Sequence, residues 1–190
     1  MLSSLDVSLF HWIAGSSASP SLLVYFAIIC AKALIYILPL YLILFWVYGG
    51  ASGRKTVVTI LIAVGVSLFI SFLIGLFFYR PRPFIDGVGA ALIDHRANAS
   101  FPSNHAIIFA TYVTVLFMLH YKTAAKIVLV AGLLTCWARI YVGVHYPFDI
   151  IGGIILGVCT GFVVVRFVVS IISDKVLKIC YKLPPKLDEN

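Results

Sequence analysis

The chain has 190 residues, of which 62% are hydrophobic and only 11% are charged, and its formal net charge is +7. Soluble domains are about 45–50% apolar and about 25% charged, so this composition excludes a soluble globular domain, a disordered chain and a nucleic-acid-binding module. The high apolar content predicts an all-α, polytopic membrane helix bundle. The positive net charge agrees with this prediction, because an excess of Lys and Arg is typical of the cytoplasmic loops of membrane proteins.

The N-terminal segment, residues 1–20, has only a short and interrupted apolar run. Leu5, Leu9 and Trp12 recur in it at helical spacing, with polar residues between them. This amphipathic pattern predicts a short helix that lies in the membrane interface. A sixth membrane crossing at this position is the alternative interpretation.

Five apolar segments follow, and each is predicted to cross the membrane as a helix: 21–48, 56–78, 104–119, 124–142 and 148–171. The third segment is short, so its helix should begin below the membrane surface or be supported by its neighbours. Gly152, Gly153 and Gly157 in the last segment predict close packing against another helix. We expect residues 1–190 to form one membrane domain.

Basic residues alternate along the chain in a way that predicts an orientation. Pairs of them lie between the first and second segments and between the third and fourth, and four lysines lie in the tail at 172–190. The positive-inside rule makes these three regions cytoplasmic. The connection at 79–103 and the turn at 143–147 then share the outer face.

Polar residues far apart in the sequence concentrate at this outer face. Arg82 lies in the 79–103 connection, Arg139 ends the fourth segment, and His145 and Asp149 lie where the fifth begins. Ionisable residues near membrane depth are costly, so a cluster of them indicates a functional site. We therefore predict an active site here, with 79–103 as its outer loop.

The residue types in this cluster suit a phosphate group. Arg82 and Arg139 present planar guanidinium groups that match phosphate oxygens. Ser103 and Asn104 lie where the third segment begins, so their side chains and free backbone N–H groups can converge on an anion at a helix N-terminus.

Two histidines add the chemistry of a reaction. His105 and His145 are suited to act as a nucleophile and an acid. Asp149 follows His145 by four residues, which places both on one face of a helix that begins at or just before His145. A carboxylate in that position orients an imidazole and stabilises its charged form.

Three motifs in this region resemble those of the phosphatidic acid phosphatase type 2 superfamily of membrane lipid phosphatases, which read K-x6-R-P, P-S-G-H and S-R-x5-H-x3-D. The corresponding residues here are Gly75 to Pro83, Pro102 to His105, and Ala138 to Asp149. Within that superfamily, the wording F-P-S-[ND]-H and A-R-x-Y-x-G-V-H-Y-P-x-D is similar to the bacterial undecaprenyl-diphosphate phosphatases of the bacitracin-resistance type.

The resemblance implies roles for the matching residues. His145 is the nucleophile that forms a phosphohistidine, Asp149 orients it, and His105 protonates the leaving group. The residues assigned to hold the phosphoryl oxygens are Arg82, Arg139, Ser103 and Asn104. The resemblance implies no metal and no cofactor, and the acidic residues of the outer loop are too few and too far apart to hold Mg²⁺.

The chain departs from the family motifs at three positions. Gly75 stands where the family has lysine, so one phosphate-binding cation is missing. Arg80 in the loop and Lys32 in the first segment are the two candidates to replace it, and a structural role is open for each. Asn104 replaces the motif glycine and Ala138 the motif serine. These changes bear on substrate choice more than on activity.

The expected function is hydrolysis of undecaprenyl diphosphate to undecaprenyl phosphate at the outer face of a bacterial cytoplasmic (inner) membrane. Such an enzyme recycles the cell-wall carrier lipid and gives bacitracin resistance. Its expected partners are the polyprenyl diphosphate and membrane lipids, and the oligomeric state is open. Alternatives are a phosphatidic acid or phosphatidylglycerol-phosphate phosphatase, a lipid phosphotransferase, and a non-enzymatic transporter or bacitracin-binding protein.

Overall fold

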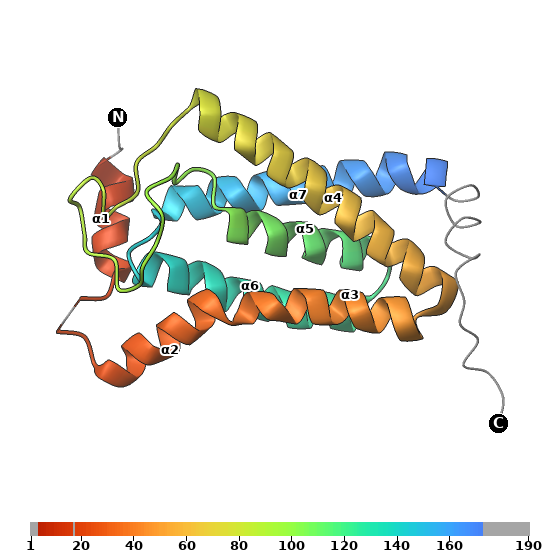
Figure 1. Cartoon of the computed structure of the whole chain (residues 1–190), viewed down its shortest axis with the longest axis horizontal. Helices are drawn as coiled ribbons and strands as arrows, with labels where there is room; N and C mark the ends of the chain where they lie inside the picture. Colours follow the sequence, from red (N-terminus) through yellow and green to blue (C-terminus); the bar gives the residue numbers. More distant parts are fainter. Residues whose placement is uncertain (1–3, 17, 173–190) are drawn as a thin grey trace.

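The computed structural model describes residues 4–16 and 18–172, and every regular element in that part of the chain is helical (Figure 1). The elements are α1 (Ser4–Ile13), α2 (Ser21–Lys32), the 3₁₀ helix η1 (Leu34–Tyr36), α3 (Ile37–Tyr48), α4 (Gly50–Phe77), α5 (Asn104–Met118), α6 (Lys122–Tyr141) and α7 (Pro147–Ile172). The predicted tail beyond residue 172 lies outside the described residues.

Five helical units have the apolar character of membrane crossings. Four are long enough by themselves, namely Ser21–Tyr48, Gly50–Phe77, Lys122–Tyr141 and Pro147–Phe167, and α5 is a shorter apolar helix, as predicted. The all-α bundle predicted from composition is confirmed, and the chain is a multi-pass membrane protein.

The first crossing is interrupted between α2 and α3. The 3₁₀ helix η1 separates them, and Pro39 follows in the first turn of α3. A proline lacks the N–H that would bond the carbonyl four residues earlier, and its ring crowds that carbonyl. The break therefore lies where Pro39 prevents a regular turn, and α2 and α3 run in visibly different directions (Figure 1).

Helix α5 packs against α4, α6 and α7 at the centre of the bundle. Its approach to α7 is close because small residues line the contact. A Cβ on Gly153 would lie 2.7 Å from the carbonyl oxygen of Ser103, and one on Gly157 would lie 2.5 Å from that of Ile107. The predicted packing against another helix is confirmed for Gly153 and Gly157, whereas Gly152 faces the Phe101 side chain of the loop before α5. The contact brings the start of α5 against the start of α7.

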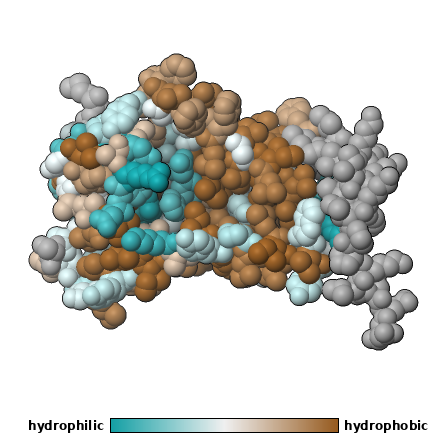
Figure 2. All heavy atoms as spheres, viewed as in Figure 1, coloured by the Kyte–Doolittle hydropathy of each residue, from teal (hydrophilic) through white to brown (hydrophobic). Residues whose placement is uncertain are grey.

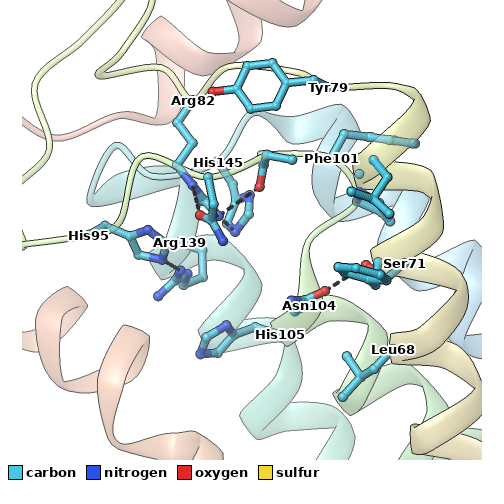
Figure 3. A pocket seen from close by; sticks show the side chains of 16 residues that line it. Leu68, Ser71, Tyr79, Arg82, His95, Phe101, Asn104, His105, Arg139 and His145 are labelled. Carbon is cyan, nitrogen blue, oxygen red and sulfur yellow. Dashed lines mark hydrogen bonds between the residues drawn. The ribbon is translucent and has the colours of Figure 1, made fainter.

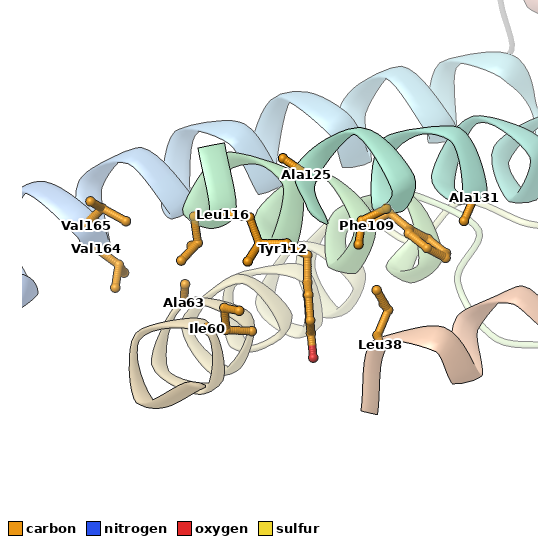
Figure 4. Close-up of a cluster of buried hydrophobic side chains, with 12 residues drawn as sticks. Leu38, Ile60, Ala63, Phe109, Tyr112, Leu116, Ala125, Ala131, Val164 and Val165 are labelled. Carbon is orange, nitrogen blue, oxygen red and sulfur yellow. The ribbon is translucent and has the colours of Figure 1, made fainter. Parts of the chain in front are cut away.

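The core between these helices is apolar, and so is much of the outer surface. Ile60, Ala63 and Leu116 are among its fully buried residues (Figure 4). On the outside, Phe69 and Ile155 are more than half exposed. In a membrane, lipid covers such faces, so the helices associate through close packing rather than through the hydrophobic effect.

One end of the bundle is polar. Helix α1, the connection between α4 and α5, and the turn between α6 and α7 all lie there (Figure 1). Hydrophilic residues gather over this end, whereas hydrophobic residues dominate the rest of the visible surface (Figure 2). Backbone hydrogen bonds join the three segments: the Gly15 N–H donates to the carbonyl of Tyr141 at 2.8 Å, and the Leu92 N–H donates to that of Val142 at 2.9 Å.

The predicted N-terminal helix is present as α1. Asp6 and Phe10 are its buried residues, whereas Trp12 is 87% exposed. Asp6, which lies between the apolar positions of this helix, therefore packs against the protein together with Phe10.

Candidate active site

A cavity of about 590 Å³ lies at the polar end of the bundle. The predicted residues that line it are His145 and His105, the arginines Arg82 and Arg139, and Asn104. They come from the outer loop, the start of α5, the end of α6 and the turn before α7, and their side chains face one another (Figure 3). The structure thus brings together residues that are up to 63 positions apart in the sequence.

His145 is held beside Asp149 by the start of α7. The helix begins at Pro147, two residues later than the expected start, so His145 lies in the preceding turn. Its Nδ1 is 3.5 Å from Asp149 Oδ2, and the same oxygen accepts the backbone N–H of Tyr146 at 2.8 Å. The carboxylate at the third helical position thus bonds back to the residue before the helix, as in a capping box. Pro147 suits the first helical position because its N–H is missing.

The two ring nitrogens of His145 face partners that select one tautomer. Asp149 is an acceptor next to Nδ1, so Nδ1 carries the proton. Arg82 Nη1 is a donor 3.2 Å from Nε2, so Nε2 keeps its lone pair. Burial lowers the pKa of His145 to about 4, against the opposing effect of the Asp149 carboxylate. At neutral pH the imidazole is therefore neutral and its Nε2 is unprotonated, the form that can act as a nucleophile.

Arg82 is fixed by the outer loop. Its Nε and Nη2 donate to Asn98 Oδ1 at 3.1 and 3.0 Å, Nη2 also donates to the Ala99 carbonyl, and Nη1 donates to the Val144 carbonyl at 2.7 Å. Burial lowers the pKa of Arg82 to about 10, so the guanidinium remains charged at neutral pH. A positive charge is thus held 3.2 Å from His145 Nε2, where a phosphoryl group would develop negative charge.

Arg139 faces a third histidine, His95. Arg139 Nη2 lies 2.6 Å from His95 Nε2, and His95 Nδ1 lies 3.1 Å from the carbonyl of Arg96. Burial lowers the pKa of His95 to about 4, so His95 is neutral and accepts from Arg139 while its Nδ1–H donates to the backbone. Arg139 Nε has no hydrogen-bond partner among the described residues, which leaves a buried donor.

The N-terminus of α5 forms another wall of the cavity. His105 and Asn104 line it, and Asn104 Oδ1 accepts the hydroxyl of Ser71 at 2.8 Å, which ties α5 to α4. Ser103 precedes the helix and is fully buried, and its hydroxyl makes no hydrogen bond within the described ranges. The first N–H groups of a helix have no partner within it, so this end of α5 suits an anion.

The two candidates to replace the missing family lysine, Arg80 and Lys32, do not line this cavity. Lys32 is exposed on α2. Arg80 is turned to the carboxylates of Asp6 and Asp149 instead. Gly75 does line the cavity, so the position of the family lysine is part of the site even though its charge is absent.

Several residues of the site were not found by sequence reasoning. Ser100 donates its hydroxyl to Asp149 Oδ2 and lies 3.4 Å from His145 Nδ1. Asn98 accepts hydrogen bonds from Arg82, and His95 accepts one from Arg139. Asp6 reaches the site from the N-terminal helix. The only signal for the loop residues was their polarity in the outer loop, and for Asp6 there was none.

The turn that carries His145 depends on Gly143. Its φ is +79°, and a Cβ would lie 2.3 Å from the carbonyl oxygen of Ala90. We expect Gly143→Ala to lower the free energy of unfolding by about 2–5 kcal/mol, from left-handed backbone strain plus overlap, and to reduce activity. Gly87→Ala is the control, since Gly87 has a φ of +68° but open space around it. Thermal unfolding in detergent measures both, and an equal loss in the two variants would contradict the role of the contact with Ala90.

One cavity at the polar end of this membrane protein thus has two histidines and two buried arginines in its wall, and these residue types suit a phosphate group. The PAP2 superfamily model matches residues 56–172. The chain belongs to the PAP2 superfamily, a superfamily of phosphatases.

Named relatives agree with this membership. "Putative undecaprenyl-diphosphatase YbjG" of Escherichia coli (strain K12) is 35% identical over 157 residues, covering 83% of this chain and 79% of that protein. "Undecaprenyl-diphosphatase BcrC" of Bacillus subtilis (strain 168) is 32% identical, covering 86% and 84%. The crystal structure of a PAP2-type phosphatidylglycerolphosphate phosphatase from Bacillus subtilis shares the fold, with a TM-score of 0.64 and 23% identity over 90% of this chain and 88% of that one.

Proposed function

We propose that the protein hydrolyses undecaprenyl diphosphate to undecaprenyl phosphate without a metal ion, through a phosphohistidine on His145. The reaction recycles the cell-wall carrier lipid and gives bacitracin resistance. The names of two relatives, at 32–35% identity over most of both chains, support this substrate. The observation that carries the proposal is the neutral His145, whose Nε2 lies beside Arg82 in a cavity that also has an apolar wall.

The apolar wall comes from α4. Leu68, Phe72 and Leu76 line the cavity, and Phe72 and Leu76 are about 60% exposed on a membrane-crossing helix. Lipid therefore reaches the cavity's edge at this face. A ligand with an anionic head and a long apolar chain satisfies both sides of such a site, since the head meets the arginines and the chain stays in the membrane.

The proposed reaction has two steps. His145 Nε2 attacks the terminal phosphorus, and the bond from that phosphorus to the bridging oxygen breaks. The leaving lipid phosphate takes a proton from His105, while Asp149 stabilises the positive charge on His145. Water then attacks the phosphohistidine with His105 as the base, which releases inorganic phosphate and restores His145. Arg82 and Arg139 stabilise the charge on the phosphoryl oxygens in both steps.

A substrate panel tests the function. The purified protein in detergent, with excess EDTA, should release phosphate from undecaprenyl diphosphate faster than from phosphatidic acid or phosphatidylglycerol phosphate. Vanadate should inhibit it, because a five-coordinate vanadate resembles the transition state. A preference for a monophosphate lipid would contradict the proposed substrate. Loss of activity in EDTA that Mg²⁺ restores would contradict the metal-independent mechanism.

We further propose that the site faces the outside of a bacterial cytoplasmic membrane, which the distribution of basic residues supports. Ala90 and Thr123 are exposed at opposite ends of the bundle. In a cysteine-free background, Ala90→Cys should react with a membrane-impermeant thiol reagent added to intact spheroplasts, and Thr123→Cys should react only after lysis. The reverse labelling pattern would overturn the orientation.

A further inference from the structure

The guanidinium group of Arg80 lies between two buried carboxylates. Its Nη1 donates to Asp149 Oδ1 at 2.7 Å, and its Nη2 donates to Asp6 Oδ2. Both aspartates are fully buried, whereas the Arg80 side chain is 19% exposed. Because the guanidinium fork is planar and rigid, one nitrogen on each carboxylate fixes their relative position.

Aromatic packing holds Arg80 in this place. Its guanidinium carbon lies 4.4 Å from the ring centroid of Tyr146, a cation–π distance. The Tyr146 ring packs in turn against Phe10 of α1, with centroids 5.5 Å apart, and both rings are buried. Helix α1 therefore supports Arg80 in two ways. Asp6 binds its guanidinium group, and Phe10 packs against the Tyr146 ring that this group contacts.

Asp6 also contacts the start of α7 directly. Its Oδ1 accepts the backbone N–H of Phe148 at 3.0 Å, and this N–H belongs to the first turn, where helices leave donors without intrahelical partners. Asp149 lies in that same turn. Helix α1 is therefore joined to the turn that carries Asp149 both directly and through Arg80.

Charge explains why the bridge matters for the reaction. Two buried carboxylates near each other cannot both remain ionised without a cation, so one would take up a proton. A protonated or rotated Asp149 would no longer accept from His145 Nδ1, and the tautomer that leaves Nε2 free would be lost. Arg80 supplies the balancing charge at Oδ1 of Asp149, whereas His145 and Ser100 contact Oδ2.

We propose that helix α1 completes the active site, with Asp6 and Arg80 as positioning residues that hold Asp149 in the orientation that presents His145 for attack. The inference rests on the proposed function in that His145 is the nucleophile. It gives Arg80 a role different from the substrate contact suggested by its sequence position, and it makes the N-terminal helix part of the catalytic apparatus.

A double-mutant cycle tests this role, with Arg80→Gln, Asp6→Asn and the two combined. Arg96→Gln and Asp94→Asn are matched controls on exposed residues of the outer loop. We expect Arg80→Gln to slow single-turnover phosphoenzyme formation by about 10- to 100-fold, by analogy with residues that orient the ligands of metal sites, with little change in KM. Asp6→Asn should slow it in the wild-type background and cause no further loss in the Arg80→Gln background, because asparagine keeps an oxygen that accepts the Phe148 N–H and only the ion pair with Arg80 is removed.

Other outcomes would overturn the proposal. A raised KM at an unchanged single-turnover rate would mean that Arg80 binds the substrate, and equal losses from Asp6→Asn in both backgrounds would mean that Asp6 acts alone. The same cycle is run on unfolding temperature, which needs no substrate. Should the wild type hydrolyse other phosphate esters but not undecaprenyl diphosphate, the proposed substrate fails while a non-additive cycle still supports the bridge. If the changes in unfolding temperature of the two single variants simply add in the double variant, Asp6 and Arg80 are not coupled, which contradicts the bridge.

Discussion

Replacing His145 with alanine should abolish turnover on every substrate. His145 is the one histidine whose ring is both held by a carboxylate and adjacent to a buried arginine among the described residues. Removing the nucleophile of a comparable triad costs about 10⁶-fold in kcat, which lies below the background of a phosphate-release assay. Activity is measured on undecaprenyl diphosphate and on an activated aryl phosphate, and both should be lost.

His11→Ala is the control for this experiment, because His11 is exposed on α1 at the same end of the bundle and does not line the cavity. Its activity should stay near that of the wild type. Unfolding temperatures of both variants show whether the fold is intact. Residual turnover of a folded His145→Ala variant above background would contradict the nucleophile assignment.

Replacing His105 with alanine should give a loss that depends on the leaving group. His105 lines the cavity from the first turn of α5, and its proposed role is to protonate the departing oxygen. General acid catalysis is worth typically about 10²–10⁴-fold. A lipid alkoxide needs the proton far more than an activated aryl oxide, so the loss should be large on a lipid monophosphate and small on the aryl phosphate.

The ratio of the two rates is the informative quantity in this second experiment. Steady-state rates of His105→Ala and the wild type are compared on both substrates, so any general damage to the cavity cancels. Equal losses on the two substrates would contradict the role of His105 as the acid. A loss confined to the aryl phosphate would contradict it as well.

The membrane-crossing segments could be predicted because they depend on local composition. Runs of apolar residues longer than the membrane thickness have few other solutions. The observed helices begin and end within two residues of the predicted segments, except that α4 begins at Gly50, six residues before the predicted 56–78 segment. The location of η1 was not predicted, although Pro39 is a visible signal for a local break. The uninterrupted hydropathy of residues 21–48 predicts one continuous crossing.

The site could be predicted only where residues follow a motif. His105, His145, Arg82 and Arg139 meet at one cavity because the topology returns the chain to the same end of the bundle. Asp6 could not be predicted, since it pairs with a residue 74 positions away and a single aspartate between apolar residues reads as a solvent-facing position. Burial of that carboxylate depends on a cation that only the three-dimensional packing brings to it.

The direct test of the central claim is to find the phosphate. Purified protein is mixed briefly with undecaprenyl diphosphate labelled in its terminal phosphate, quenched in alkali to preserve phosphohistidine, and mapped by mass spectrometry. We expect acid-labile phosphate on His145 in the wild type and in His105→Ala, and none in His145→Ala. Label on His105, or turnover without any labelled histidine, would contradict the account.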